Sequence, residues 1–502
     1  MRLTALFPRL VMRWPSALFG LVVCGIALSA DSSRVQAAVT LPILTGSLAA
    51  PAAPLKAGAF AQDITPLSFP ISVNGNMTNV RATRANDQLH ARCLVLDDGT
   101  TALALVVCDS CMIPREVIDS AKAQAAKLTA IPTTNIFISA THSHSCPAVG
   151  SVFQTDAEVE YAKFLAEKIA LGIQTAHQQR AEAKVGFGQA NDPTQIFNRR
   201  WKMKPESIRP NPFGKIDQVV MNPGYGNPGL IERAGPVDPQ ISLLSVQTPA
   251  GQPVCLFANY GLHYVGGTPP NELSADYFGA YAERMSQLLG ATNVKPPFMA
   301  AMTNGTSGDV NNIDFSMKVG PTRGVLGQIK VVSESVSQAS FVAYQQISYQ
   351  PEVSLKAVEK DLTLKVRKPT AEELQQAKDL LAKAGPQPYR TMPEVYARET
   401  VLMAEFPDTV PVRVQAMRVG DIAILGIPCE VFAEIGLELK QKSPFKSTFV
   451  ISLANGYNGY LPTPEQHAVG GYETWRARSS YLEEGASTQI VATLLELLAQ
   501  LK

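Results

Sequence analysis

The sequence predicts an α/β protein in which mixed β-sheets are layered with helices. Short runs rich in Val, Ile, Leu and Ala, each bounded by turn residues, alternate with longer segments whose apolar residues recur at helical spacing. Hydrophobic residues make up 46% of the 502 residues and charged residues 17%, so the chain can bury a sizeable core. No repeat and no interior linker interrupts this pattern, and we expect one large domain.

The composition also excludes several classes of protein. Glycine and proline number 35 and 36, which is ordinary usage and argues against collagen-like or low-complexity chains. The formal net charge is +1, and the basic residues form no stripe along the sequence. A protein that neutralises phosphates usually shows a basic excess, so we expect no nucleic-acid partner.

The N-terminus has the pattern of a secretory signal peptide. Three arginines precede an apolar run over residues 17–30, and small residues up to Ala37 offer a cleavage site. The run is shorter than the roughly 20 residues of a membrane-spanning helix. We therefore expect a signal peptide over 1–37, a linker over 38–57 and a folded domain over 58–502, in a periplasmic or secreted protein. An uncleaved membrane anchor is the alternative.

Strands and helices are expected in alternation along the domain. Short apolar runs predict strands over 91–96, 102–108 and 135–140. Capping boxes at Thr155-x-x-Glu158 and Thr370-x-x-Glu373 predict helices over about 155–175 and 370–385. Apolar residues at helical spacing predict two further helices, over about 274–289 and from 487 to the end.

Six cysteines follow the predicted cleavage site, and two of them form the C-x-x-C sequence Cys108-Asp-Ser-Cys111. Such a pair is redox-active in a thioredoxin context. Here it ends a very apolar strand, and no second pair completes a zinc site. We expect buried free thiols or one local disulfide.

The segment from Gly224 to Gly229 matches the dinucleotide-binding fingerprint G-x-G-x-x-G letter for letter. That fingerprint functions only where it opens a helix after a strand. Prolines at 223 and 228 flank it, so we expect a turn-rich loop and no nucleotide site.

The strongest chemical signal is the sequence ISATHSHSCP, residues 138–147. Residues two apart on a strand point to the same side, so His142 and His144 can face one cavity at the end of the strand. Imidazoles paired in this way suit Zn²⁺, although two hydrogen-bonded histidines are the simpler interpretation. His263 lies in a second strand-to-loop passage, NYGLHYVGG, and spacing alone does not identify the remaining ligands.

Three further loops follow apolar strands and concentrate reactive side chains, as functional loops often do. They are residues 304–312 (NGTSGDVNN), 426–430 (GIPCE) and 454–460 (ANGYNGY). Each by itself is more often a turn than a site. The chain contains no G-x-S-x-G sequence, which disfavours an α/β-hydrolase with a serine nucleophile.

Taken together, the number and order of these motifs resemble the neutral (non-lysosomal) ceramidases. The resemblance begins near Gly58 and covers that family's large N-terminal domain, without its C-terminal β-sandwich. It rests on AFAQDITP, LHARCLVLDDG, ISATHSHSCP, FNRR, VDPQISLL, NYGLHYVGG, NGTSGDVNN, GIPCEVFAEIG, NGYNGYLPTPEQH and YLEEGAST.

The resemblance implies a zinc amidohydrolase that cleaves an N-acyl bond with water activated by the metal. The family's metal ligands fall on His142, His263, Glu430 and Tyr460. Zn²⁺ held by such a set lowers the pKa of water toward ~7. The residues that the family places around the amide carbonyl fall on His144, Arg199 and Tyr472.

The chain differs from the family at one catalytic loop. Neutral ceramidases carry Gly-Asp-Val-Ser-Pro-Asn, whereas this chain has Asp309-Val-Asn311-Asn after the glycine. We expect Asn311 to contact the substrate in place of the serine and Asp309 to orient the loop or a water molecule. An asparagine forms no acyl intermediate, so direct attack by water is expected.

The residues leave the substrate open between ceramide and another amide or ester, and they leave a non-catalytic exported binding protein as an alternative to the enzyme. The expected partner is a small-molecule or lipid N-acyl substrate, reached for a lipid by peripheral contact with a membrane. No obligate protein partner is expected.

Overall fold

The computed structural model describes residues 54–502, which lie in one compact unit. The predicted signal peptide and most of the predicted linker are outside the described residues. The first strand, β1, begins at Lys56, so residues 56–57 of the predicted linker belong to the sheet. No helix within residues 54–502 is long and apolar enough to cross a membrane.

Three sheets organise the structure, and each combines antiparallel strands with one parallel pair. The first has the order β7-β6-β5-β1-β8, with bounds Ile136–Ala140, Ala102–Cys108, His90–Asp97, Lys56–Asp63 and Ala181–Glu182. The second has the order β17-β15-β14-β9-β19, with bounds Met299–Asn304, Pro253–Tyr260, Gln240–Gln247, Lys184–Asn191 and Tyr349–Gln350. The third has the order β20-β21-β22-β24, with bounds Leu355–Lys365, Thr409–Val419, Ile422–Gly426 and Ser447–Ile451.

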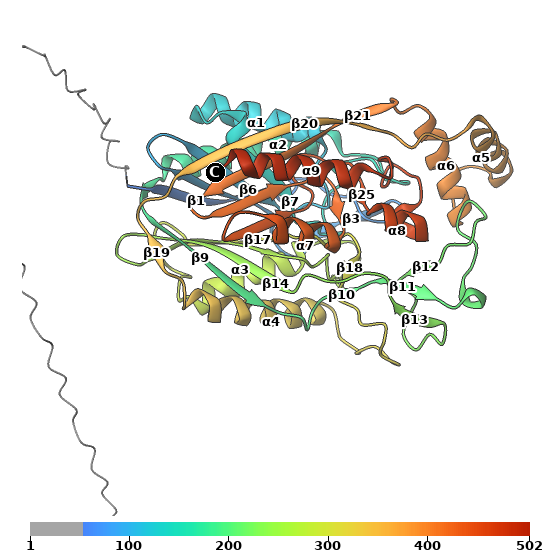
Figure 1. Cartoon of the computed structure of the whole chain (residues 1–502), viewed down its shortest axis with the longest axis horizontal. Coiled ribbons are helices and arrows are strands. Elements are labelled where there is room, and N and C mark those ends of the chain that lie inside the picture. The colour runs from blue at the N-terminus through green and yellow to red at the C-terminus, as the bar shows by residue number, and fades with distance from the viewer. Residues whose placement is uncertain (1–53) are drawn as a thin grey trace, which may run out of the picture. The chain divides into compact units, whose positions relative to one another are not determined.

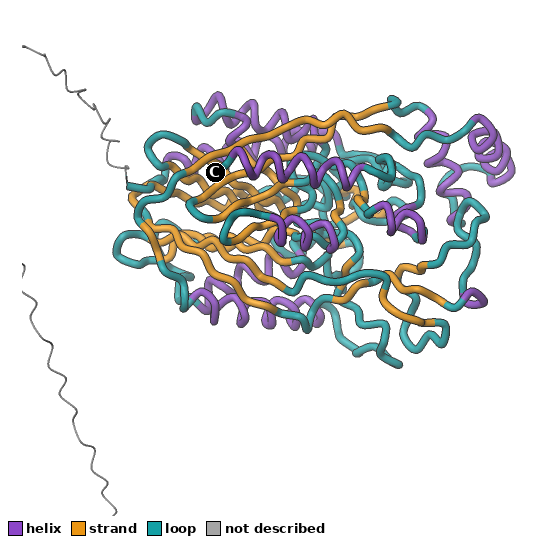
Figure 2. The backbone as a smooth tube through the Cα atoms, viewed as in Figure 1, coloured by secondary structure: helices purple, strands orange, loops and turns teal. Residues whose placement is uncertain are grey.

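Helices cover the outer faces of the sheets (Figures 1 and 2). The pair α1 (Arg115–Thr129) and α2 (Val159–Gln178) packs on the first sheet, and α3 (Asp276–Leu288) and α4 (Gly327–Tyr344) pack on the second. The third sheet is covered by α7 (Ala433–Lys442) and α9 (Ala486–Gln500). The mixed α/β fold predicted from the alternating pattern is confirmed.

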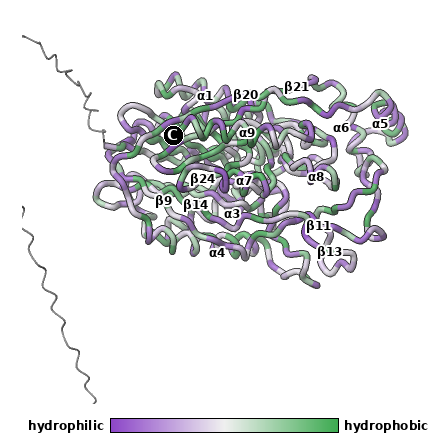
Figure 3. Tube along the Cα trace, viewed as in Figure 1, coloured by the Kyte–Doolittle hydropathy of each residue, from purple (hydrophilic) through white to green (hydrophobic). Residues whose placement is uncertain are grey.

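The inner faces of the three sheets meet in a common apolar core. Leu94 of β5, Phe257 of β15 and Phe449 of β24 are all fully buried there. Figure 3 shows the hydrophobic segments concentrated among these central strands. This core fixes the sheets relative to one another, and therefore also fixes the loops that leave their strands.

The parallel pairs place the candidate residues on neighbouring loops. In the pairs β6–β7, β15–β17 and β22–β24, both strands run in the same direction, so the loops that follow them leave from one edge. His142 follows β7, His263 follows β15 and Glu430 follows β22. Residues distant in the sequence thereby reach one place.

Shorter elements complete the structure. Short pairs of strands are β2 (Ile71–Val73) with β3 (Val80–Ala82), β4 (Arg84–Ala85) with β16 (Glu272–Leu273), β10 (Phe197–Asn198) with β18 (Val310–Asn311), and β23 (Glu430–Val431) with β25 (Tyr460–Leu461). A small sheet joins β11 (Arg200–Met203), β12 (Val219–Met221) and β13 (Leu230–Arg233). It lies at the end of the molecule that also carries α5 (Ala371–Ala384), α6 (Met392–Ala404) and α8 (Pro464–Val469) (Figure 1).

The predicted strands are confirmed as β5, β6 and β7, and the predicted helices as α2, α3, α5 and α9. The capping box at Thr370 and Glu373 is present with both of its hydrogen bonds. The prediction of a capping box at Thr155 is wrong. The backbone of Thr155 pairs with Val152, the carboxylate of Glu158 accepts the amide of Ser72, and α2 begins only at Val159.

Two expectations about single motifs are also confirmed. The segment from Gly224 to Gly229 forms turns and opens no helix, with Gly224 at φ 89° and Gly226 at φ 64°. The six cysteines among the described residues are buried and free, so Cys108 and Cys111 form no disulfide.

Candidate metal centre

The first element of the centre is His142, which lies two residues after β7 at φ 73°, a left-handed backbone conformation that is uncommon for a residue other than glycine. Its backbone amide donates to the carbonyl of Ser110 at 2.8 Å. Its Nδ1 lies 2.7 Å from the carbonyl oxygen of Cys111. A carbonyl only accepts, so Nδ1 carries the proton and the lone pair of Nε2 points into the centre.

His263 is held in the same way from another sheet. Its Nδ1 lies 3.0 Å from the carbonyl oxygen of Ser307, in the loop that follows β17. Nδ1 is again the protonated nitrogen, and Nε2 faces the centre. The two imidazole rings lie 4.4 Å apart between centroids and are perpendicular. The two imidazoles therefore converge from β7 and β15 with their Nε2 atoms toward the centre, where a terminal nitrogen of Arg199 also lies 3.4 Å from Nε2 of His263.

Glu430 completes a group of three. Its Oε2 lies 3.2 Å from Nε2 of His142 and 4.0 Å from Nε2 of His263. Its Oε1 accepts a hydrogen bond from the hydroxyl of Tyr457 at 2.9 Å, whereas the buried Oε2 has no hydrogen-bond partner among residues 54–502. Three electron-pair donors with no hydrogen between them meet at this point, and the ligand atoms all lie within 4.8 Å of one another.

Such a group fits a metal ion. A buried carboxylate oxygen without a partner is costly, and buried charges are usually paired or coordinate a metal. The pKa shifts of His142 and Glu430 also indicate that positive charge is favourable at this point. Burial opposes protonation of His142, but the Glu430 carboxylate outweighs this and raises the His142 pKa well above its usual value. Conversely, His142 outweighs the effect of burial on Glu430 and lowers the Glu430 pKa.

Tyr460 lies beside this group because β23 and β25 pair in parallel with Glu430 opposite Tyr460. Its hydroxyl oxygen accepts a hydrogen bond from the Arg199 guanidinium at 3.1 Å. Burial, reinforced by the Glu430 carboxylate, raises the Tyr460 pKa well above its usual value. Without a cation, Tyr460 is therefore a phenol at neutral pH.

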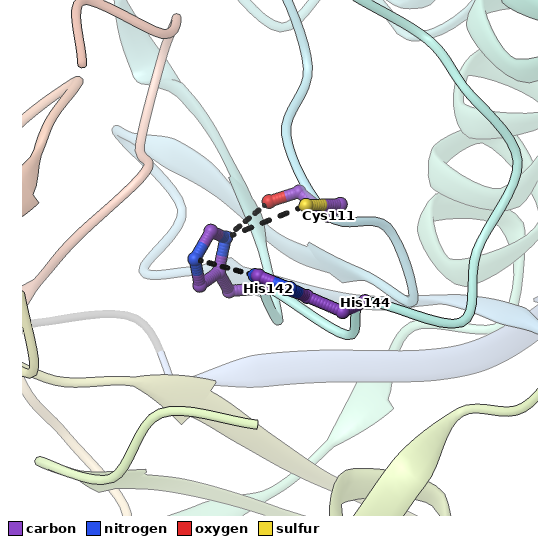
Figure 4. Close-up of side chains that lie close together, drawn as sticks. All are labelled: Cys111, His142 and His144. Carbon is purple, nitrogen blue, oxygen red and sulfur yellow. Dashed lines mark hydrogen bonds between the residues drawn. The ribbon is translucent and has the colours of Figure 1, made fainter. Parts of the chain in front are cut away.

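His144 also lies beside His142, although both histidines are in the loop after β7 and not on the strand from which their common direction was predicted. Its Nε2 lies 3.2 Å from Nε2 of His142, and Figure 4 shows the two rings together with Cys111. The other side of the His144 ring stacks on Tyr264, with centroids 3.7 Å apart. A Cβ at Gly75 would lie 2.4 Å from the ring, so only glycine allows this approach. Burial, followed by the charges of His142 and Arg199, lowers the His144 pKa well below its usual value.

Arg199 is fixed by a residue that the sequence did not indicate. Its Nε donates to Glu473 at 3.0 Å, and a second nitrogen donates to the carbonyl of Gly308 at 2.8 Å. Glu473 is fully buried, and its other oxygen accepts from Arg200 at 2.6 Å. Two adjacent buried arginines require a carboxylate nearby, and Glu473 meets this requirement from 274 and 273 residues away.

Tyr472 lies at the edge of the centre, with its ring 5.8 Å from that of Tyr460. Burial raises the Tyr472 pKa above its usual range. Tyr472 also lines a cavity of about 500 Å³, together with Trp475, Met392, Met203 and Asn222. This cavity adjoins the centre. A larger cavity of about 810 Å³, beside α3 and α4, contains none of the predicted site residues.

Asp309 and Asn311 are not gathered with the histidines. Asp309 is fully buried and accepts from Asn198 at 2.7 Å and from the amide of Ala433 at 2.8 Å, so it ties the loop to β10 and α7. Asn311 donates to Asn222 at 2.8 Å and accepts the amide of Ile313 at 3.0 Å. Both polar groups of Asn311 are thus bonded within the protein, next to the cavity that Asn222 lines.

Two tyrosines that the sequence pattern did not indicate, Tyr457 and Tyr264, also support the centre. The hydroxyl of Tyr457 holds Oε1 of Glu430, and the ring of Tyr264 holds His144. Both belong to motifs that were singled out for other residues, NGYNGY and GLHYVGG. A tyrosine directly beside a predicted ligand was the signal in each case.

The sequence matches no family model and no curated protein. The structure, however, matches solved structures of ceramidases. The neutral ceramidase of Pseudomonas aeruginosa superposes with a TM-score of 0.67 and 16% identity, over 89% of this chain and 74% of that chain. A structure described as ceramidase complexed with C2 matches with the same score and identity, over 89% of this chain and 75% of that chain. At this identity the match concerns the fold, and the chain has the fold of neutral ceramidase.

Proposed function

We propose that the protein is an exported zinc-dependent amidohydrolase that cleaves an N-acyl bond. The observation that carries this proposal is the unpartnered, buried Oε2 of Glu430, which faces the Nε2 atoms of His142 and His263. The ceramidase fold supports it, because the group lies on the loops where the resemblance places the metal.

Two imidazoles, a carboxylate and a phenol suit Zn²⁺, which accepts nitrogen and oxygen ligands. His142, His263 and Glu430 would hold the ion, and Tyr460 beside Glu430 would add a fourth ligand. When bound, Zn²⁺ supplies a Lewis acid that polarises a carbonyl and makes water reactive near neutral pH.

The other residues of the site would stabilise the carbonyl oxygen and transfer a proton. Arg199 is fixed by Glu473 and Gly308, so its guanidinium is oriented before the substrate arrives. We assign to Arg199 and Tyr472 the donation of hydrogen bonds to the carbonyl oxygen, whose negative charge grows as water adds to the carbonyl carbon. His144 is neutral, so it can accept a proton from the attacking water and deliver it to the nitrogen as the C–N bond breaks. The products are a carboxylic acid and an amine.

The substrate class follows from the cavity beside Tyr472. Its lining is mostly apolar and includes three methionines, at 203, 221 and 392, whose flexible side chains adapt to varied shapes. We propose an N-acyl compound with an apolar chain. Asn311 replaces the serine of the ceramidases, which favours an amide or ester other than ceramide as the second candidate substrate.

The experiment combines metal analysis with a substrate panel. Protein purified without a histidine tag should contain one Zn²⁺ per chain, and it should hydrolyse a member of a panel of ceramides and shorter N-acyl amides. A chelator should abolish turnover, and added Zn²⁺ should restore it. Metal-loaded protein that binds panel members without cleaving any of them would instead identify a binding protein.

We also propose that residues 1–37 are removed during export. The N-terminus of protein from the native cell should then begin near Ala38, in a periplasmic or secreted fraction. An intact Met1 in a cytosolic fraction would contradict export without affecting the metal centre.

A further inference from the structure

Exposed apolar side chains are concentrated at one end of the molecule. Among residues 54–502, twelve large apolar side chains are exposed, and six of these fall within residues 216–231 and 317–325. The most exposed of the six is Val319, at 76%. Single exposed apolar residues are normal on soluble proteins, but such a concentration marks an interaction surface.

The two segments form one projecting structure. They share a small core of Trp201, Met203 and Phe315, apart from the three main sheets. The amide of Gly226 donates to the carbonyl of Met317 at 3.0 Å. The ring of Tyr225 packs so closely on Gly320 that a Cβ there would lie 2.2 Å from it. Three exposed side chains therefore lie together, and we call them the apolar tip: Tyr225, Met317 and Val319.

The segments around the apolar tip carry an excess of positive charge. Residues 197–233 and 313–325 carry seven exposed Lys and Arg side chains against four Asp and Glu, besides the buried pair Arg199 and Arg200. Without that buried pair the net charge of these segments is +3, and Lys202 and Arg233 form ion pairs with Glu232 and Asp314. Lys318 stands between the two apolar residues of the tip, and Arg323 follows them.

The apolar tip is also continuous with the proposed substrate cavity. The loop that carries Tyr225 contributes Asn222, Pro223 and Asn227 to the wall of the cavity of about 500 Å³. Tyr472, which also lines this cavity, has its ring 5.8 Å from that of Tyr460 at the metal centre. The cavity therefore has residues of the tip loop and a neighbour of the metal centre in the same wall lining.

We propose that the apolar tip inserts into the surface of a lipid bilayer that carries anionic headgroups, and so places the cavity at the membrane. Apolar side chains that enter the interface, with basic residues beside them, give this mode of binding. The choice of a bilayer as the occupant rests on the proposed function, because a lipid N-acyl substrate resides in one.

The test measures vesicle binding and requires no turnover. Purified full-length protein is sedimented with vesicles of phosphatidylcholine alone or of phosphatidylcholine and phosphatidylglycerol at about 7:3. Met317→Glu with Val319→Glu should weaken partitioning at least tenfold on the apolar burial lost. Lys318→Glu with Arg323→Glu should weaken binding to anionic vesicles by roughly fivefold per basic residue removed and leave neutral vesicles unaffected.

A matched control carries the same charges elsewhere. Leu128 in α1 and Val342 in α4 are 44% and 55% exposed, and Leu128→Glu with Val342→Glu should bind vesicles as the wild type does. All variants keep the same N-terminal segment, so a difference between them reports the tip. Bound metal and Tm should be unchanged throughout.

Two results would overturn the proposal. The first is equal vesicle binding by the wild type and the tip variants. The other is a dimer in gel filtration that the tip substitutions convert to a monomer without any change in vesicle binding, because the tip would then join two copies of the chain. Vesicle binding through the tip by a protein that cleaves no N-acyl compound would refute the proposed function and leave the docking surface standing.

Discussion

Two buried glutamates of this protein have opposite surroundings. Glu399 of α6 is fully buried, and Arg478 satisfies it with bonds of 2.9 Å from Nε and 2.7 Å from a terminal nitrogen, besides one from its backbone amide. Glu430 is 4% exposed, yet only its Oε1 has a hydrogen-bond donor, the hydroxyl of Tyr457. Its Oε2 faces two imidazole nitrogens.

The difference separates a carboxylate whose charge is matched within the chain from one whose second oxygen is not. Burying a carboxylate is costly unless its charge is matched. At Glu399 the chain supplies the cation as Arg478, so the group is complete. At Oε2 of Glu430 the chain supplies only further electron-pair donors, so this oxygen is matched only by a cation from outside, a proton or a metal ion. Burial alone does not distinguish the two glutamates, whereas the hydrogen-bond partners of their carboxylate oxygens do.

The largest expected effect is at Glu430. Glu430→Ala removes a ligand, so bound metal should fall from one per chain to nearly none, and turnover should fall at least ~10³-fold. Elemental analysis and hydrolysis assays measure both. Glu438→Ala, on the exposed side of α7, is the control and should retain the metal. Stoichiometric metal in Glu430→Ala and in a His142→Ala, His263→Ala double variant would place the metal elsewhere.

The second effect is on stability and is expected at Glu399. Glu399→Ala leaves the guanidinium of Arg478 without its carboxylate, and should lower the free energy of unfolding by about 3–5 kcal/mol. Urea denaturation in the presence of a chelator measures this change. Glu496→Ala removes the partner of Lys360 in an exposed ion pair and should cost at most about 1 kcal/mol. Similar losses in the two variants would contradict the comparison.

The sequence predicts an element correctly where that element depends on contacts between residues close together in the chain. The capping box at Thr370 involves contacts within four residues and is predicted correctly. The same pattern at Thr155 fails because Glu158 bonds to Ser72, 86 residues away. Helix α4 was not predicted, since its sequence is rich in serine and valine, and burial of Val332 and Val336 on the second sheet overrides weak helix propensity.

The residues of the site were likewise predictable only where the signal is local in the sequence. His142, His144 and His263 stand out because histidine is rare in this chain and follows strands at these positions. The role of Glu473 was not predictable, because it depends on Arg199 and Arg200 lying beside it, 274 and 273 residues away. The resemblance to ceramidases brought in Glu430 and Tyr460, and pairing of β23 with β25 places them side by side.

The third effect concerns pH. Asp309 is a buried carboxylate bonded directly to two neutral donors and to no cation, and burial raises its pKa to about 6. A carboxyl whose pKa is higher folded than unfolded stabilises below the unfolded value of about 3.8, and this contribution is lost as pH rises through about 6.

Metal-free wild type should therefore lose stability from pH 4 to pH 6 more steeply than Asp309→Ala, by up to ~1.4 kcal/mol per pH unit. Denaturation at pH 4, 5, 6 and 7 measures the two slopes. Burial also raises the Asp276 pKa to about 6, so Asp276 gives wild type and variant a common background. Parallel slopes would show that Asp309 titrates alike in the folded and unfolded chain.

The fourth effect sharpens the comparison at the single donor of Glu430. Tyr457→Phe frees Oε1, and the loss of a group that orients a metal ligand should weaken metal binding about 10–100-fold. Competition with a chromogenic chelator measures the affinity. Tyr481→Phe removes a buried hydroxyl bonded to Asn458 and should leave the affinity unchanged. Equal losses in the two variants would indicate general loosening of the structure.

The smallest effect is expected at Asn311, whose polar groups, unlike those of Glu430, are all bonded. Asn311→Ser restores the residue type of the ceramidases and removes the bond to Asn222, at a cost of about 1 kcal/mol. Asn222 lines the cavity beside Tyr472, so its release should change the ratio of kcat/KM between a ceramide and a shorter N-acyl amide by about fivefold, with bound metal unchanged. Asn135→Ser, which breaks a comparable bond to Ala102 far from the centre, should leave the ratio as it is. An unchanged ratio in Asn311→Ser would remove Asn222 and Asn311 from substrate selection, and loss of the metal would show that this loop supports the metal centre itself.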